Sequence, residues 1–185
     1  MELHNEHFIR ECCKGNRTYQ KQLFESLYTP MFRLSIRYVK HHADAEDCTM
    51  KGFMKMFQHI HGFVYEGENS LQRWTKRIMV NECLMFLRTK NKALLFPEDD
   101  LPQIPVSAEI LMQLDAEDLN NLILELPIGY RSVFNLYVVE GYDHKEIASM
   151  LNISENTSRS QLMKAKAKLK NMIEQQQMNY ENSRR

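Results

Sequence analysis

The stretch that decides the fold is GYDHKEIASMLNIS, residues 141–154. Asp143 opens a short helical pattern and Glu146 follows three residues later, which is the spacing of a capping box. Asn152 suits the left-handed conformation that ends many helices. Ser154 can then cap a second helix. The stretch therefore predicts two helices joined by a three-residue turn, which is a helix-turn-helix arrangement.

The second of these helices, expected over residues 155–174, has two different faces. At 100° per residue, one arc carries the small and apolar residues Ser158, Leu162, Ala165, Leu169, Met172 and Ile173. The opposite side carries residues of the types that contact base edges and phosphates. These are Asn156, Thr157, Arg159, Ser160, Met163 and Lys164, and Lys168 continues the positive charge. The simpler alternative is an ordinary solvated basic face.

Helical spacing extends over nearly the whole chain of 185 residues, and no clear period-two segment is present. We therefore expect an all-α fold of two small helical domains joined by a flexible acidic linker. The expected boundaries are an N-terminal helical bundle at 8–94, the linker at 95–118, a C-terminal helix-turn-helix domain at 119–177 and a disordered tail at 178–185. We also expect a helical hairpin over residues 22–39, broken or kinked at Thr29-Pro30.

The distribution of charge and the number of cysteines limit the kinds of protein that this chain can be. The formal net charge is zero, but residues 73–92 carry six Lys or Arg against one acid, whereas residues 97–126 carry eight acids and no Lys or Arg. The four cysteines form no CxxC pair and are most simply buried or idle thiols. We expect no metal site and no cofactor. Because no membrane-spanning run or signal segment is visible, the default expectation is a cytoplasmic protein.

A helix expected to begin at His42, with Asp44 as its cap and Asp47 in capping-box position, carries an unusually wide apolar arc. The apolar side chains cover about 160° of the helix, which is wider than one-sided burial requires. They are Met50, Phe53, Met54, Met56, Phe57 and Ile60. A Met-rich surplus of this kind suits docking of a partner. Deeper burial within the chain's own bundle is an equally good explanation.

Residues 62–70 form a turn-rich loop, and the helix that follows is apolar almost all round. The polar residues that interrupt this apolar surface lie within an arc of about 80°. They are Arg73, Arg77, Asn81 and Arg88. A narrow basic stripe beside an aromatic loop suits capture of nucleic acid with a base displaced from the stack. Three solvated arginines are the alternative.

The C-terminal motif resembles region 4 of the small extracytoplasmic-function sigma factors of bacterial RNA polymerase. The match runs through Leu126, Pro127, Arg131, Val133, Phe134, Gly141, Tyr142, Glu146, Ile147, Ala148, Leu151, Ile153, Ser154, Thr157 and Ser160. The resemblance implies that Arg159, Ser160, Met163 and Lys164 read the upstream, minus-thirty-five promoter element.

The N-terminal half resembles region 2 of the same family. The match runs through Phe24, Leu27, Tyr28, Arg37, Tyr38, Ala45, Glu46, Asp47, Phe53, Trp74, Arg77, Ile78, Asn81, Leu87 and Arg88. The resemblance implies docking on the polymerase through Glu46, Asp47, Met50, Phe53, Met54 and Phe57. It implies contact with the minus-ten element and DNA melting through Arg73, Trp74, Arg77, Asn81 and Arg88, with a flipped base near Asn81.

Together these observations predict a sigma factor for transcription initiation and not an enzyme. Its expected partners are core RNA polymerase, contacted at the β′ clamp and the β flap, and promoter DNA. A membrane-tethered anti-sigma factor is a common further partner in the family. A stand-alone helix-turn-helix regulator acting without polymerase is the main alternative, and a pure interaction module leaves the basic stripes unexplained. We also hypothesise that the acidic linker competes with DNA phosphates for the basic faces of the two domains. The other explanation is that the linker charge is merely solvated.

Overall fold

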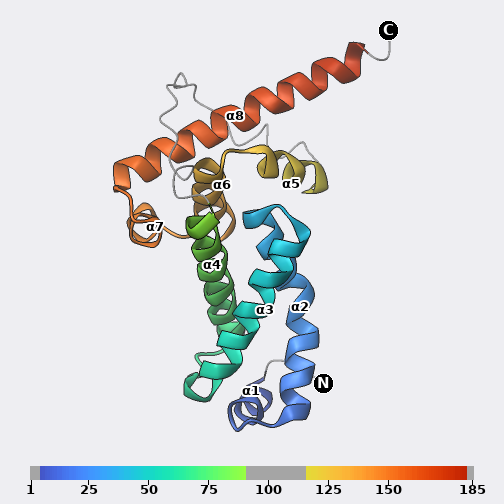
Figure 1. Ribbon diagram of the computed structural model, residues 1–185, viewed down its shortest axis with the longest axis vertical. Helices are drawn as coiled ribbons and strands as arrows, with labels where there is room; N and C mark the ends of the chain where they lie inside the picture. The colour runs from blue at the N-terminus through green and yellow to red at the C-terminus, as the bar shows by residue number, and fades with distance from the viewer. Residues whose placement is uncertain (1–4, 91–115, 183–185) are drawn as a thin grey trace. The chain divides into compact units, whose positions relative to one another are not determined.

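The computed structural model describes residues 5–90 and 116–182, and every regular element in these ranges is helical (Figure 1). The chain divides into two compact units, residues 1–89 and 90–185. This confirms the all-α fold class with two helical parts. Among the described helices, none combines the length and the apolar character that crossing a bilayer requires.

The N-terminal unit contains α1 (Glu6–Cys13), α2 (Arg17–Val39), α3 (His42–His59), the short 3-10 helix η1 (Ile60–Gly62) and α4 (Ser70–Lys90). One face of α2 is buried from Leu23 to the end of the helix. Its apolar residues recur at helical spacing, at Leu23, Leu27, Met31, Leu34 and Tyr38. This face packs on α3, where the ring of Phe53 lies 4.7 Å from that of Phe24. The core of the unit therefore lies between α2, α3 and α4.

The expected break at Thr29-Pro30 is wrong, because α2 continues through Pro30 as one helix of 23 residues. Pro30 lies on the exposed side of α2. The buried residues Leu27 and Met31 flank it and hold both halves of the helix against the same core. Burial of this face outweighs the loss of one backbone hydrogen bond, a loss that proline imposes on any helix.

The expected cap of α3 is also wrong. The residue that precedes the helix is His41, and its side chain makes no capping hydrogen bond. Asp44 lies inside the first turn, where its negative charge still favours the positive end of the helix dipole. The helix begins at His42 as expected, but the predicted cap, Asp44, lies three residues after the observed one, His41.

Helices α3 and α4 run antiparallel and side by side (Figure 1). Thr75 Oγ1 donates to the sulfur of Met56 over 3.4 Å. One turn further along, Met79 of α4 packs directly against Gly52 of α3, so closely that a Cβ on Gly52 would collide with its sulfur. Helices α3 and α4 therefore approach so closely here that any residue larger than glycine at position 52 would displace Met79.

The C-terminal unit contains α5 (Ala116–Glu125), α6 (Ile128–Phe134), the π-helical turn η3 (Asn135–Val139), α7 (His144–Leu151) and α8 (Glu155–Asn182). Arg131 braces its first two helices. The guanidinium is buried and donates to the carbonyls of Leu124 and Leu126 at 2.9 and 3.3 Å, which would otherwise lack partners at the end of α5. Burial lowers the pKa of Arg131 to about 10, so it remains charged at neutral pH.

The ends of this unit differ from the expected boundaries. Helix α5 begins at Ala116, so the last residues of the segment expected to be a linker are helical. Helix α8 continues to Asn182, well into the segment expected to be a disordered tail. Residues 155–182 contain neither glycine nor proline, so nothing in the sequence stops the helix earlier. Most of the acidic linker, including the part with the prolines, lies outside the described residues.

The contact between Gly52 and Met79 predicts that replacing this helical glycine by alanine lowers the stability of the protein, although such a replacement usually raises it. In an ordinary helix Gly→Ala stabilises by up to about 1 kcal/mol. Here Gly52→Ala should instead lower the free energy of unfolding by about 1–3 kcal/mol, because the buried Met79 must be displaced. Urea unfolding followed by circular dichroism measures the change. The matched control is Gly62→Ala, where the added methyl meets open space. Equal effects of both substitutions would contradict the packing argument.

Candidate nucleic-acid interface

The turn between α7 and α8 is built by local hydrogen bonds, as the sequence predicts. Asp143 Oδ1 accepts from the Glu146 N–H at 2.8 Å and Glu146 Oε2 accepts from the Asp143 N–H at 3.0 Å, which completes a capping box. Asn152 ends α7 in the left-handed conformation, with φ 56° and ψ 50°. The Thr157 N–H then donates to Ser154 Oγ at 3.0 Å. These contacts confirm the helix-turn-helix geometry.

Helix α8 buries the face that its helical spacing predicts. Ser158, Leu162, Ala165, Leu169 and Ile173 are all buried. Met172 is half-buried, and Gln161, which sequence reasoning did not place on this face, is buried as well. The packing of this face fixes the rotation of α8 about its axis, and therefore decides which side chains point outward.

The outward side of α8 carries most of the residues expected to contact DNA. Asn156, Arg159, Ser160 and Met163 are exposed, and Lys164 and Lys168 are half-buried. Thr157 is also half-buried, and its hydroxyl lies 2.8 Å from Ser154 Oγ, where it helps to complete the turn.

Arg159 forms an ion pair with Glu155 one turn earlier, at 3.1 Å. Both side chains are well exposed, so this pair is weak and can exchange for a stronger partner. Such a partner must be an acceptor that matches the planar guanidinium, such as a guanine edge or a phosphate.

His144 ties the start of α7 to α8. Its Nδ1 lies 2.9 Å from Ser158 Oγ, and its ring stacks on Tyr137 of η3 with 4.5 Å between ring centroids. Burial lowers the pKa of His144, and the positive charge of Arg159 lowers it further. The imidazole is therefore neutral at pH 7, which lets it join the two helices without adding charge beside the groove-facing residues.

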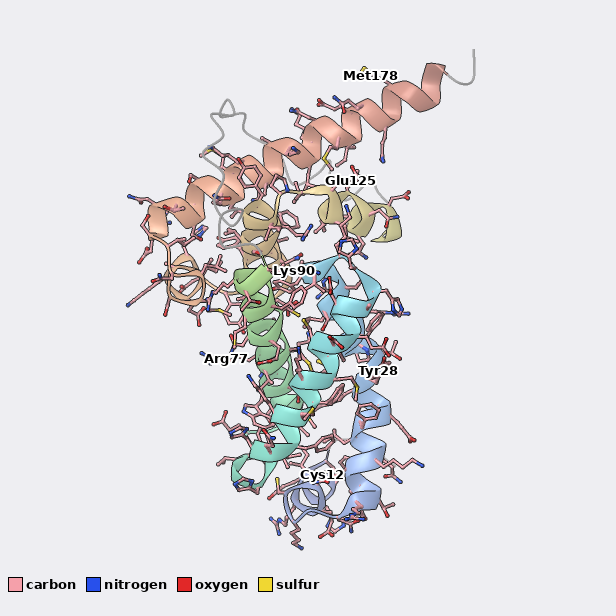
Figure 2. The ribbon with its side chains drawn as sticks, in the orientation of Figure 1. Cys12, Tyr28, Arg77, Lys90, Glu125 and Met178 are labelled. Carbon is pink, nitrogen blue, oxygen red and sulfur yellow. The ribbon has the colours of Figure 1, made fainter. Side chains whose placement is uncertain are left out.

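Helix α4 presents the polar stripe that the sequence predicts. Arg73, Arg77 and Asn81 are exposed, and Trp74 and Arg88 are half-buried. Figure 2 shows Arg77 on the side of α4 that faces away from α3. The structure therefore places all five residues on accessible parts of one helix.

A groove of about 540 Å³ lies between this helix and α3. Trp74, Ile78 and Met85 give it apolar surface. Lys55, His59, Asn81, Glu82 and Arg88 line its polar part. A groove with cations beside an aromatic ring can hold a negatively charged ligand that has a flat ring.

Sequence reasoning missed Lys55, His59, Glu82 and Met85. Lys55 Nζ and Glu82 Oε1 form an ion pair at 2.6 Å, in which the carboxylate is almost fully buried. These two residues are 27 positions apart, so no local pattern connects them. Only the antiparallel packing of α3 and α4 brings them to the same groove.

The loop before α4 is closed by local hydrogen bonds at Ser70. The Ser70 hydroxyl donates to the Gly67 carbonyl at 2.6 Å, and Gly67 and Asn69 both have positive φ, at 93° and 63°. At the root of the loop the ring of Phe63 lies 5.2 Å from that of Trp74. Val64 beside it is 71% exposed. An apolar side chain is therefore displayed from a well-braced loop next to the stripe.

The wide apolar arc of α3 divides into a buried and an exposed part. Met56 and Ile60 belong to the core, whereas Met50 and Met54 are 42% and 60% exposed and Phe57 is half-buried. Burial in the chain's own bundle therefore explains part of the arc, and docking stays a prediction for the exposed part. Glu46 and Asp47 are exposed on the same helix.

Phe53 is misassigned as a docking residue, because only 2% of it is exposed. Its ring packs against those of Phe24 and Tyr28 from α2, so it cannot reach a partner directly. The remaining docking residues, Glu46, Asp47, Met50, Met54 and Phe57, leave an acidic and Met-rich face on α3. Within the described residues, no group of three or more His, Cys, Asp or Glu side chains is placed to hold a metal ion.

Two family models match the chain, in the order in which the two units occur. The model for sigma-70 region 2 matches residues 23–93, which include α3 and α4. The model for sigma-70 region 4 matches residues 116–169, which include α5 to the first half of α8. Together the matches cover more than half of the chain and contain nearly all of the candidate site residues.

Curated relatives agree with these matches. The ECF RNA polymerase sigma factor SigM of Bacillus subtilis is 25% identical over 152 residues, covering 80% of this chain and 91% of that protein. SigM of Mycobacterium tuberculosis strain H37Rv is also 25% identical, over 86% of this chain and 79% of that protein.

Among solved structures, CnrH in complex with the cytosolic domain of CnrY has a similar fold. Its TM-score is 0.51 at 17% sequence identity, and the match covers 91% of this chain and 96% of that one. Two family models in the expected order, named relatives along most of the sequence and a shared fold lead to one conclusion. This chain belongs to the sigma-70 family of RNA polymerase sigma factors and is a member of its extracytoplasmic-function group.

Proposed function

We propose that this sigma factor divides transcription initiation among three surfaces, each on a different helix. The observation that carries this proposal is the pairing, in one chain, of a helix-turn-helix with a separate unit that has a basic groove and an exposed Met-rich face. As an extracytoplasmic-function sigma factor, the protein binds core RNA polymerase and promoter DNA. The proposal concerns which residues perform each step.

Docking on core polymerase is assigned to α3. Met50 and Met54 provide exposed apolar area that a monomer gains nothing by displaying, and Glu46 and Asp47 add charge at one end of it. Methionine side chains adapt their shape to the opposing surface. An apolar patch with an acidic edge suits a partner surface that is apolar at its centre and basic at its rim. The β′ clamp is the site on polymerase that the family resemblance assigns to this face.

Melting of the minus-ten element is assigned to α4 and the loop before it. Arg73, Arg77 and Arg88 attract the phosphate backbone. Trp74 and Asn81 border the groove between α3 and α4, where an unpaired base can stack on the ring and bond the amide. The braced loop with the exposed Val64 can enter the opened duplex without first becoming ordered.

Reading of the minus-thirty-five element is assigned to α8. Asn156, Arg159, Ser160 and Met163 point outward near its N-terminal end, which is the part of a recognition helix that contacts bases. Lys164 and Lys168 are placed further along to contact phosphates. The β flap is the expected polymerase contact for this unit, and the exposed Tyr137, Val138 and Val139 of η3 offer it an apolar surface.

We further propose that the chain itself performs no catalysis and acts in the cytoplasm, where bacterial polymerase and chromosome are located. The CnrH structure contains the cytosolic domain of CnrY, and on that analogy an anti-sigma factor is a proposed partner of this chain. A stand-alone regulator is not favoured, because it leaves the region 2 match and the groove on α4 without a function.

Promoter discrimination should depend on Arg159. Arg159→Ala should remove the preference for one base pair of the upstream element, at a cost of about 1–3 kcal/mol in discrimination, if the guanidinium pairs with guanine. Lys168→Ala should weaken binding about equally on all sequences, because a phosphate contact carries no sequence information. Competition binding of holoenzyme to promoter variants measures both effects. Equal loss of preference in the two variants would refute the assignment.

Promoter opening should depend on Asn81. Asn81→Ala should leave the closed complex largely intact and reduce opening by about tenfold, which corresponds to the loss of one good hydrogen-bonded contact to a base. Permanganate reactivity of unpaired thymines reports opening directly. The control is Asn121→Ala, an exposed asparagine of α5 outside the groove. If Asn81→Ala abolishes the closed complex while the protein stays folded, α4 is a docking element instead.

Core binding should depend on Met54. Met54→Glu should reduce affinity for core polymerase by about tenfold or more, because a charge would be buried without a partner in the interface. The matched control is Met178→Glu, since Met178 is similarly exposed, at 56% against 60%, but lies near the end of α8. Circular dichroism verifies that both variants are folded. Unchanged core affinity of folded Met54→Glu protein would exclude this face as the docking surface.

A further inference from the structure

Two of the four cysteines face each other across the contact between α3 and α4. The contacts Met56–Thr75 and Gly52–Met79 follow one antiparallel register, in which each step of four residues back along α3 matches a step of four forward along α4. The next step in this register pairs Cys48 with Cys83. Both cysteines are buried, and their thiols are joined by a hydrogen bond. The pair therefore lies in the interior, one turn from the closest contact between the helices.

The surroundings of the pair are polar for a protein core. Thr49 Oγ1 lies 2.9 Å from Ser35 Oγ and donates to the Ala45 carbonyl at 2.7 Å. The Ser35 hydroxyl in turn contacts the Cys83 thiol. Two hydroxyl groups beside two thiols give the site groups that can accept or pass on a proton.

The two thiols differ in acidity. The hydrogen bond from the Cys83 thiol lowers the pKa of Cys48 despite burial, and the positive charge of Lys51 contributes to the lowering. The same hydrogen bond and burial raise the pKa of Cys83. Burial also raises the pKa of Cys12, to about 12. We assign the first attack to Cys48, because Lys51 lies near enough to favour its thiolate and Cys48 is the less deeply buried of the two.

We propose that Cys48 and Cys83 are a redox-active pair, which a hydroperoxide converts to an intramolecular disulfide between α3 and α4. The Cys48 thiolate attacks the peroxide O–O bond, which yields a sulfenic acid at Cys48 and releases water after proton transfer. The Cys83 thiol then attacks the sulfenic sulfur, forms the S–S bond and releases a second water. The balance is two thiols and one hydrogen peroxide to one disulfide and two waters. A dithiol reductant reverses it by thiol–disulfide exchange.

The bond has a consequence for the two helices. Sulfur atoms in a disulfide are about 2.05 Å apart, far closer than two hydrogen-bonded thiols. Because Met79 already contacts Gly52, a closer approach of the helices displaces the Met79 side chain or makes α4 rotate or slide along α3. Asn81 and Glu82 directly precede Cys83 and move with it. On the proposed function, the oxidised protein therefore loses promoter opening reversibly.

The chemical step is tested on the protein alone. The full chain is treated with hydrogen peroxide, alkylated, digested with trypsin without reduction and analysed by mass spectrometry. The expected product is a cross-link between the peptides 41–51 and 78–88 that disappears on reduction with dithiothreitol. It should also form in a Cys12→Ser/Cys13→Ser variant and be absent in Cys83→Ser. If Cys83→Ser does not fold, Cys48→Ala provides the same comparison. Full alkylation of Cys48 and Cys83 after treatment, or their conversion to sulfinic acid, overturns the proposal.

The functional consequence is tested separately. The sigma factor is oxidised, freed of peroxide and only then mixed with core polymerase and promoter DNA. We expect permanganate reactivity at least several-fold below that of the reduced protein, restored by dithiothreitol and unaffected by peroxide in Cys83→Ser. Equal opening by cross-linked and reduced protein overturns the switch. Failure of the reduced protein to open any promoter counts instead against the proposed function, so the two failures are distinguishable.

Discussion

Where Met79 of α4 packs against Gly52 of α3, the space between the two helices is filled by one flexible side chain, and a larger residue at position 52 would have to displace it. The placement of both functional faces in the N-terminal unit follows from this contact. It belongs to the register that brings Cys48 to Cys83. It also leaves Met50 and Met54 exposed on α3 while α4 forms the other wall of the groove. One packing contact thus positions the proposed docking surface and the proposed nucleic-acid surface on neighbouring helices.

The C-terminal unit achieves its geometry differently, through local backbone chemistry. The capping box of α7, the left-handed Asn152 and the cap at Ser154 each satisfy backbone groups that would otherwise lack partners, and a good cap contributes about 1 kcal/mol. The long packing face of α8 then fixes which residues point outward. Recognition of duplex DNA needs a rigid helix at a set angle, and a short hydrogen-bonded turn provides it. The groove of the N-terminal unit instead suits a displaced base, which comes to the protein outside the duplex.

This difference explains what could be predicted from the sequence. The caps of α7 and α8, the turn between them and the buried face of α8 depend on neighbours within a few residues, and they are confirmed. The cap of α3, predicted from the same kind of local pattern, is wrong. Pro30 did not break α2 because distant residues bury the helix on both sides of it. Phe53 lies in the core because α2 supplies aromatic partners from another part of the chain. The Lys55–Glu82 pair and the cysteine pair likewise depend on tertiary packing, which no local spacing reveals.

The central claim is that this chain acts with core polymerase and not alone. The most direct measurement is transcription from bulk genomic DNA by purified core polymerase, with and without the full chain, followed by sequencing of RNA 5′ ends. New start sites are expected only when both are present, and these sites should share two upstream elements at constant spacing. DNA binding by the chain with no new start sites and no association with core polymerase would contradict it and would favour a stand-alone regulator.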